Sequence, residues 1–278
     1  MKTTSLPAVE ERLSGIGSVA IGGMLLEQRP NALVRALHRS GARDLFVTSA
    51  PAASWDVDLL VGTGRVARMR VPHVSLGVVG LAPSMRRAGE QGLVIEEADE
   101  ALLLGGYLAA NHDVAAQLLE NMGTNDVVAD NPLVTWVGDH PGVGPLRVNV
   151  VLLHAPIGDS GGNLVHHGSR WADLLLARSA DRVIAQVDRL VPAAQAHGPV
   201  TIPGYLVDDV VEVPYGAHPV GCVRGYVADL DHLAYYAAEV AAGRLGEYVD
   251  SHVAVTHDEY LATVGHERLD ALTAEAAA

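Results

Sequence analysis

The chain has 278 residues, of which 49% are hydrophobic and 19% are charged. This composition excludes a disordered linker or tail, because a chain so apolar and so weakly charged can bury a large core. The net charge of −14 at pH 7 would repel a phosphate backbone, which argues against a nucleic-acid partner.

The sequence indicates a cytoplasmic protein with no membrane anchor. Cys222 is the only cysteine, so neither an intrachain disulfide nor a thiolate zinc cluster can form. Residues 1–13 lack the apolar run of a signal peptide, and the longest low-charge stretch, residues 101–110, is about half of a membrane span.

The first half of the chain predicts a βαβ unit. Residues 19–21 form a short β-branched run that ends in two glycines, and residues 31–40 place apolar side chains on one helical face before a glycine. Residues 45–48 form the next strand. A strand, a helix and a second strand in this order favour a parallel sheet, and therefore the α/β class.

The second half repeats this pattern. The predicted elements are a strand at 148–153, a helix at 173–180, strands at 183–187 and 210–213, and helices at 231–242 and from 258 onward. We interpret residues 1–278 as one domain, with a lobe or active-site rim at about 81–145. Within that lobe the pattern is helical from about 96 to 119 and irregular from 123 to 145.

The segment Gly158-Asp-Ser-Gly-Gly162 matches the sequence of a hydrolase nucleophile motif around Ser160. A nucleophile elbow needs a tight turn that leads into a helix. Here Asn163 and Val165 indicate a turn followed by a strand. We therefore interpret Ser160 as part of a solvent-facing turn.

Two loosened dinucleotide patterns, at 15–20 and 62–67, are weak because neither follows a strand and opens a clear helix. The 13 histidines include the adjacent pair His166 and His167, and His252 with His257. Neighbours on a strand point to opposite faces, and a spacing of five separates two side chains on a helix. A shared metal ion is therefore not expected.

Glu100 ends an acidic run at the start of the predicted lobe helix. A helix dipole stabilises carboxylates in a first turn, which explains most of the run. Glu100 also adjoins an apolar stretch, so partial desolvation could raise its pKa into the range of a general base.

Glycines follow two of the predicted strands, at Gly22 and Gly23 and at Gly216, where Ala217 and His218 come next. In open α/β sheets ligands bind at the carboxyl ends of strands. Ordinary tight turns explain these glycines equally well.

Several segments resemble the α subunit of class I coenzyme A transferases, in the glutaconate CoA-transferase branch. They cover nearly the whole chain, at 19–24, 29–30, 55–66, 148–163, 182–184, 202–219 and 258–265. The run V-D-D-V-V-E-V-P-Y-G-A-H-P, residues 207–219, is the most specific of them.

The resemblance implies an open, mostly parallel sheet flanked by helices, the CoA-transferase fold, in which two similar subunits form one site. In this family a glutamate attacks the donor thioester, and an acyl anhydride and then a glutamyl-CoA thioester carry coenzyme A to the acceptor acid. That glutamate belongs to the β subunit. The resemblance therefore implies a β-subunit partner, in a heterodimer or heterotetramer, with acyl-CoA as substrate and with no metal or tightly bound cofactor.

A ring-opening CoA hydrolase branch lacks that nucleophile and uses an α-subunit glutamate to activate water for C–C bond cleavage. Its glutamate aligns with Asp99–Glu100, and its segment near the third strand is similar to the residues around Ser75. Glu100 would be the base in this alternative, and Ser75 a polar wall residue. Residues 111–136 depart from both branches.

We therefore predict an α subunit that transfers coenzyme A, with ring-opening hydrolysis as the alternative and a non-catalytic scaffold as a third hypothesis. The predicted site is lined by Gly22, Gly23, Gly216, Ala217 and His218. Their main-chain amides are expected to stabilise the oxyanion that forms when a thioester carbonyl is attacked.

Overall fold

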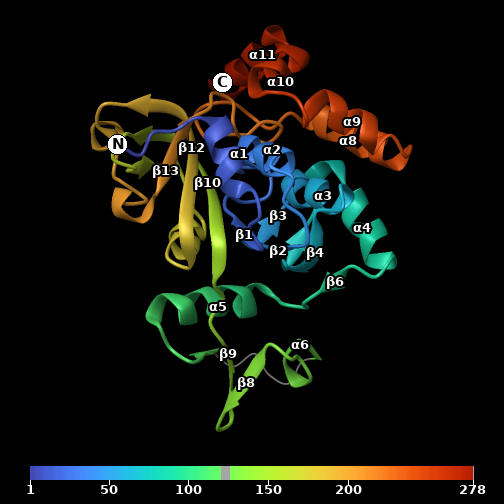
Figure 1. Cartoon of the computed structure of the whole chain (residues 1–278), viewed down its shortest axis with the longest axis vertical. Helices are drawn as coiled ribbons and strands as arrows, with labels where there is room; N and C mark the ends of the chain where they lie inside the picture. Colours follow the sequence, from blue (N-terminus) through green and yellow to red (C-terminus); the bar gives the residue numbers. More distant parts are fainter. Residues whose placement is uncertain (120–125, 278) are drawn as a thin grey trace.

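The computed structural model describes residues 1–119 and 126–277. Within these residues the main sheet has eight strands, in the order β13-β12-β10-β1-β2-β4-β6 with β11 added to β10. All neighbours along that order are parallel, and β11 runs antiparallel. The predicted α/β class, with an open and mostly parallel sheet flanked by helices, is confirmed (Figure 1). The strands are β1 Ser18–Ile21, β2 Leu45–Ser49, β4 Val66–Arg70, β6 Val94–Ile95, β10 Val148–Asp159, β11 Leu164–Val165, β12 Ala180–Val191 and β13 Asp209–Glu212.

The first βαβ unit forms as predicted. The helix α2, Asn31–Arg39, connects β1 to β2, and Val19 pairs with Val47 in parallel register. Gly41 follows the helix with φ +78°, a left-handed conformation that glycine adopts most cheaply. In the second half, β10 and β12 have 12 residues each and extend well beyond the apolar runs that predicted them.

Helices cover both faces of the sheet. The helices α1 (Leu6–Leu13), α2, α3 (Trp55–Gly62) and α4 (Pro83–Glu90) pack on one face, and α5 (Glu100–His112) and α7 (Asp173–Ala177) pack on the other. The sequence did not predict α3, because its apolar side chains are not confined to one helical face. Such a helix has no clear amphipathic period.

A buried ion pair fixes the start of α2 against α3. Arg29 and Asp56 are paired and their side chains are fully buried. The Arg29 guanidinium also donates to Ser49 Oγ at 2.8 Å and to the carbonyl of Ala52 at 3.2 Å. One side chain therefore connects β2, the strand after it and α3.

The predicted lobe contains more regular structure than its sequence indicates. The helix α5 ends at His112 instead of 119, because Asp113 takes a left-handed φ of +53°. A small antiparallel sheet follows, formed by β7 (Gln117–Leu118), β8 (Val134–Val137) and β9 (His140–Val143), next to the short helix α6 (Asp126–Ala129). Figure 1 shows this sheet and α6 beyond α5, away from the main sheet. The prediction of an irregular segment at 123–145 is therefore wrong for residues 126–143; residues 123–125 lie outside the described residues.

Four helices form the C-terminal part of the chain: α8 Leu230–Ala241, α9 Leu245–His252, α10 His257–Val264 and α11 His266–Ala277. The helix predicted at 231–242 is confirmed, and the predicted tail is two helices. The sequence did not predict α9. Among the described residues, no helix combines the length and the apolar character needed to cross a bilayer.

Candidate functional site

The chain leaves β1 at Ile21 and turns sharply. Met24 and Glu27 exchange two main-chain hydrogen bonds, which close a tight hairpin. Gly23 has φ +78°, and a Cβ at this position would lie 2.3 Å from the carbonyl oxygen of Gln28. Only glycine satisfies both conditions, because the close contact is with main chain and the φ is left-handed.

Asp173, the first residue of α7, packs directly against this turn. Its Oδ1 accepts a hydrogen bond from the amide of Gly23 at 2.9 Å. A Cβ at Gly22 would lie 2.6 Å from the same oxygen. Glycine is therefore required at the two positions for different reasons: at position 22 a side chain would collide with Asp173, and at position 23 it would prevent the turn.

The second glycine corner packs against the start of α2, which follows the first corner in the chain. The amide of Ala32 donates to the carbonyl of Gly216 at 2.9 Å, and the Asn31 side chain donates to the carbonyl of Ala217 at 2.7 Å. The amide of Gln28 donates to the carbonyl of Gly221 at 2.8 Å. Residues far apart in the sequence thus form one continuous edge at the carboxyl ends of the strands.

The amides at these two corners have protein partners and shape the turns. Their hydrogen bonds run from Gly22 to the Leu152 carbonyl, from Gly23 to Asp173, from Gly216 to the Val213 carbonyl and Asp188, from Ala217 to the Tyr226 hydroxyl and from His218 to the Tyr215 carbonyl. An oxyanion hole built from these amides would require those bonds to be given up. The function proposed below does not depend on one.

Asp188 of β12 organises the second corner. Its Oδ1 accepts from the amide of Gly216 at 3.2 Å and from the hydroxyl of Tyr226 at 3.3 Å. Tyr226 in turn accepts from the amide of Ala217 at 2.9 Å.

Burial, and then the nearby Asp188 carboxylate, raise the pKa of the Cys222 thiol. A thiol that stays protonated is a poor nucleophile.

His154, Asp188 and Cys222 bring three potential metal ligands within 4.8 Å of one another. The Oε1 of Gln186 accepts from the amide of Leu33, so its Nε2 donates to His154 Nδ1 at 2.9 Å. His154 therefore carries its proton on Nε2, which lies 3.4 Å from the Asp188 carboxylate. A metal ion at Nε2 would have to displace that proton and leave an imidazolate, so the arrangement does not favour a metal ion.

His218 is enclosed beneath the C-terminal helices. Its side chain is fully buried, with Nδ1 2.5 Å from the Tyr260 hydroxyl and Nε2 3.1 Å from Asp229 Oδ2. Burial lowers the pKa of His218 and outweighs the Asp229 carboxylate, which acts in the opposite direction. The imidazole that was predicted to line the site therefore joins the second corner to α8 and α10.

Buried histidines make the stability of the fold depend on pH. Burial lowers the pKa of His257 to about 4 and also lowers the pKa of His232 and His252. The unfolded chain takes up protons below its ordinary histidine pKa of about 6.5, while the folded chain resists them. We therefore expect the free energy of unfolding to fall as the pH drops from about 7 towards 4, by about 3 kcal/mol for His257 alone.

Urea unfolding between pH 7.5 and 4.5 measures this slope. In the variant His257→Gln the side-chain amide can still donate to the carbonyl of Pro214, as His257 Nε2 does at 2.8 Å, but it does not titrate. We expect a shallower pH dependence for this variant. Equal slopes for variant and wild type would contradict the assignment.

Ser75 and Glu100 occupy different environments. Ser75 is 7% exposed, and its Oγ accepts from the amide of Gly77 at 3.0 Å, so the hydroxyl faces its own loop. Glu100 is the first residue of α5, next to the N-cap Asp99, and is exposed. The expected desolvation of Glu100 is wrong for this chain, because the apolar face of α5 begins at Leu102.

The other sequence motifs have structural roles. Ser160 is exposed in the turn between β10 and the antiparallel β11, as predicted. Asp159 accepts from the amides of Gly161, Asn163 and Ala194, which fixes that turn. Both ring nitrogens of His166 have partners, Thr201 Oγ1 and the carbonyl of His154.

Sequence reasoning overlooked a group of cations at this edge. Arg189 and Arg224 are exposed, and neither has an ion-pair partner among the described residues. His167, which sequence analysis considered only as a metal ligand, lies near both of them. No spacing rule could have identified the group, because its members come from three separate segments.

Comparison with known proteins identifies one matching family. The model of the family described as Coenzyme A transferase matches residues 8–213. The cholesterol ring-cleaving hydrolase IpdA subunit of Mycobacterium tuberculosis is 28% identical, over 95% of this chain and 97% of the relative. The A subunit of glutaconate CoA-transferase from Acidaminococcus fermentans is 27% identical, over 90% and 88%.

Two solved structures share the fold. Glutaconate coenzyme A-transferase from Acidaminococcus fermentans superposes with a TM-score of 0.89, at 24% identity, over 98% of this chain and 95% of that chain. The decarboxylase AibA/AibB, solved as a variant with one cysteine replaced by serine, superposes with a TM-score of 0.80, at 32% identity, over 90% and 98%. The resemblance stated from the sequence is therefore confirmed.

Proposed function

The chain belongs to the coenzyme A transferase family, and from this premise we propose that it is the α subunit of a heteromeric enzyme that moves coenzyme A between an acyl-CoA thioester and a carboxylic acid. The observation that carries the proposal is the family match over residues 8–213, which includes the whole main sheet and the Gly22–Gly23 corner. The relatives named as subunits, which align over nearly their full length, support the α-subunit role.

We place the nucleophilic glutamate in the β subunit, because the carboxylates of this chain at this edge accept hydrogen bonds from other groups. Asp173 is 1% exposed and accepts from Gly23, and Asp188 accepts from Gly216 and Tyr226. The partner carboxylate would attack the thioester carbonyl, break the C–S bond and release the CoA thiolate, leaving a mixed anhydride. The thiolate then attacks the glutamyl carbonyl and releases the donor acid. The acceptor carboxylate repeats both steps in reverse.

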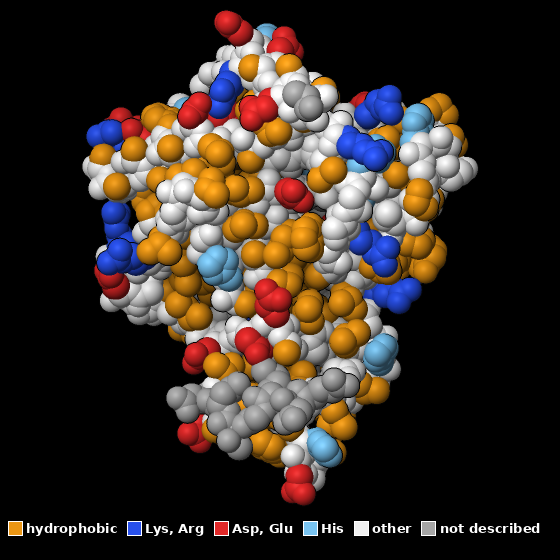
Figure 2. All heavy atoms as spheres, turned by 180° about the vertical axis from the view of Figure 1, so that it is seen from behind, with side chains coloured by type: hydrophobic (Ala, Val, Ile, Leu, Met, Phe, Trp, Pro, Cys, Tyr) orange, Lys and Arg blue, Asp and Glu red, His pale blue; other side chains and the backbone are white. Residues whose placement is uncertain are grey.

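Exposed apolar side chains beside the site support docking of the β subunit there. Val78 is 82% exposed and Leu81 is 69% exposed. Their loop touches the first hairpin, because a Cβ at Gly77 would lie 2.7 Å from the side chain of Leu26. Figure 2 shows that hydrophobic side chains also gather across the centre of one face of the molecule. Apolar surface of this kind is commonly covered by a partner.

The alternative function is hydrolysis by C–C bond cleavage, with Glu100 as the base that activates water. The similarity to the ring-cleaving IpdA subunit favours this alternative, and the exposed position of Glu100 at the start of α5 leaves its carboxylate free to meet a substrate. A non-catalytic scaffold remains the third hypothesis.

Glu100→Gln is expected to keep coenzyme A exchange within about threefold of wild type, because transfer does not use this carboxylate as a base. The measurement is exchange between an acyl-CoA and a panel of carboxylic acids by the complex with its co-expressed β subunit. The control is Glu97→Gln, an exposed carboxylate three residues earlier. If the wild-type complex instead cleaves a C–C bond of a cyclic acyl-CoA without exchange, and Glu100→Gln alone lowers that cleavage about 100-fold or more, the size expected for a general base, the hydrolase is supported.

Mass spectrometry of the complex after acyl-CoA and borohydride provides the direct test of transfer. Borohydride reduces a glutamyl-CoA thioester to the alcohol, so a transferase acquires a mass change on one β-subunit glutamate. A complex that consumes acyl-CoA without any such change contradicts the transferase proposal.

A further inference from the structure

We propose that Arg189, Arg224 and His167 bind the phosphate groups of the coenzyme A thioester. This inference rests on the function proposed above and adds the part of the substrate that this chain recognises. It starts from two arginines that lack an ion-pair partner in the described part of the chain, and a histidine beside them, in a protein whose net charge is −14.

Three segments meet at this place. Ile157 of β10 pairs with Arg189 of β12 on one side and with Val165, two residues before His167, on the other. A Cβ at Gly168 would lie 3.4 Å from the side chain of Val223, so the residues next to His167 and Arg224 are in contact. The Gln28 side chain donates to the carbonyl of Ser169 at 2.9 Å. Together with the bond from Gln28 to Gly221, these contacts put the cations beside the first hairpin and the second corner.

The turn that carries Arg224 is rigid and leaves this side chain exposed. Cys222 and Tyr226 exchange main-chain hydrogen bonds around it. Arg224 itself is exposed with φ +64°, a left-handed conformation in which glycine or asparagine would be cheaper. An arginine held in this conformation, with no ion-pair partner in the described residues, is a candidate for contact with a ligand.

The charges around His167 favour an anion. Burial lowers the pKa of His167, and then the nearby Arg224, His166, Arg189 and His197 lower it further. The neighbouring carboxylate of Asp188 accepts from Gly216 and Tyr226 and keeps its negative charge, but the two guanidinium groups outnumber it. A bound phosphate would therefore be attracted by both guanidinium groups and would favour protonation of His167.

A cavity of about 350 Å³ adjoins Arg224 and offers space for the nucleotide end of coenzyme A. Its lining includes Leu26, Glu27, Val223, Arg224, Tyr226 and Val227. Most of this lining is apolar, as a purine ring requires. Glu27 is the acidic residue in the lining, and its carboxylate can accept from amino or hydroxyl groups of a nucleoside.

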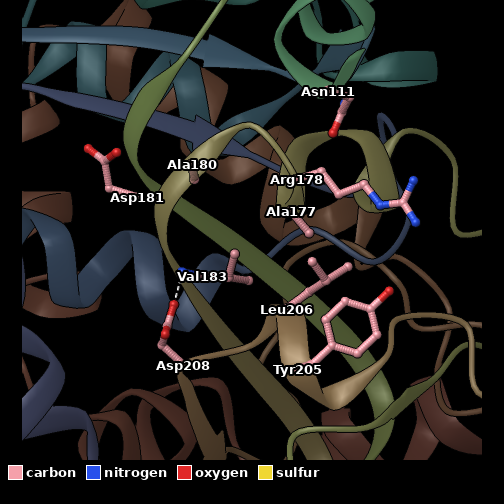
Figure 3. Close-up of a pocket in the computed structure, with 9 residues that line it drawn as sticks. All are labelled: Asn111, Ala177, Arg178, Ala180, Asp181, Val183, Tyr205, Leu206 and Asp208. Carbon is pink, nitrogen blue, oxygen red and sulfur yellow. Dashed lines mark hydrogen bonds between the residues drawn. The ribbon is translucent and has the colours of Figure 1, made fainter. Parts of the chain in front are cut away.

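A second cavity, of about 450 Å³, provides the comparison (Figure 3). Arg178 lines it and is exposed, but the carboxylates of Asp181 and Asp208 line it as well. Asp208 accepts from the amide of Val183 at 2.8 Å. These acids offset the positive charge, so Arg178 serves as the matched control for an exposed arginine beside a cavity.

The test is calorimetric titration of the α–β complex with coenzyme A and with dephospho-coenzyme A. We expect the double variant Arg189→Gln/Arg224→Gln to raise the Kd for coenzyme A at least tenfold and to lose the preference over the dephospho form. Arg178→Gln is expected to stay within twofold. Wild-type affinity should rise as the pH falls from 7.5 to 6, and this dependence should flatten in His167→Gln. Thermal unfolding of each complex checks that the variants fold.

The outcomes separate this inference from the function on which it rests. If the wild-type complex exchanges coenzyme A while the folded double variant keeps its Kd, the phosphate site is wrong and the transferase proposal stands. If the double variant binds more weakly but still prefers coenzyme A to the dephospho form, the arginines do not contact the 3′-phosphate. The inference then requires that the variant also binds 4′-phosphopantetheine more weakly than the wild type does, and equal affinities for this compound overturn it. A wild-type complex that neither binds nor turns over any coenzyme A thioester overturns both.

Discussion

Replacing Asp56 with alanine is expected to lower the free energy of unfolding by about 3–5 kcal/mol. The change leaves the Arg29 guanidinium, which is fully buried, without its counter-charge. The remaining acceptors, Ser49 Oγ and the carbonyls of Gly23 and Ala52, are uncharged and cannot compensate. Urea unfolding followed by circular dichroism measures the loss.

The pair Arg86–Glu90 is the matched control. It also joins an arginine and an acid, at 3.6 Å, but its side chains are 71% and 69% exposed. Glu90→Ala should therefore change the stability by less than about 0.5 kcal/mol. If Asp56→Ala costs no more than Glu90→Ala, burial of the Arg29–Asp56 pair does not control its energetic role.

Gly23→Ala is expected to reduce coenzyme A exchange about 100-fold, the effect of displacing a site by roughly 1 Å. The added methyl group would meet the carbonyl oxygen of Gln28 at 2.3 Å, and main chain cannot rotate out of the way as a side chain can. The hairpin must then move, and with it the hydrogen bond to Asp173. Steady-state exchange by the α–β complex measures the effect.

The control variant Gly41→Ala separates the effect of the steric clash from the effect of placing alanine in a left-handed backbone conformation. Gly41 has the same φ of +78°, but a Cβ there meets no atom within 4 Å. This variant should lose about 1 kcal/mol of stability and keep its exchange activity. Gly23→Ala should lose more stability, by about 1–3 kcal/mol of overpacking. Equal activity losses in the two variants would contradict a specific role for the first hairpin.

The sequence predicts the parallel sheet well because apolar runs and helix-ending glycines are local signals. The unit from β1 to β2 follows from such signals within about 30 residues. The lengths of β10 and β12 do not, because each strand continues as far as its neighbour pairs with it. The helix α3 is missed because Asp56 and Asp58 interrupt its apolar pattern. Both aspartates are buried, since Arg29 neutralises Asp56 and the Tyr236 hydroxyl donates a hydrogen bond to Asp58.

The site is predicted less completely than the fold. The sequence locates the two glycine corners, but it does not show that their amides are bonded within the protein, because the partners Asp173 and Tyr226 are not local. Burial of His218 by α8 and α10 likewise has no local signal. The cations at 167, 189 and 224 become one group only after three segments have packed.

The bonds that build the carboxyl-end edge join residues that are far apart in the chain, such as Gly23 and Asp173, 150 positions apart, and Asn31 and Ala217, 186 positions apart. Contacts of such long range form late in folding. A nascent chain that ends before Ala217 cannot display this surface to another polypeptide. Docking of a β subunit on this edge would therefore require a chain that extends at least to Ala217.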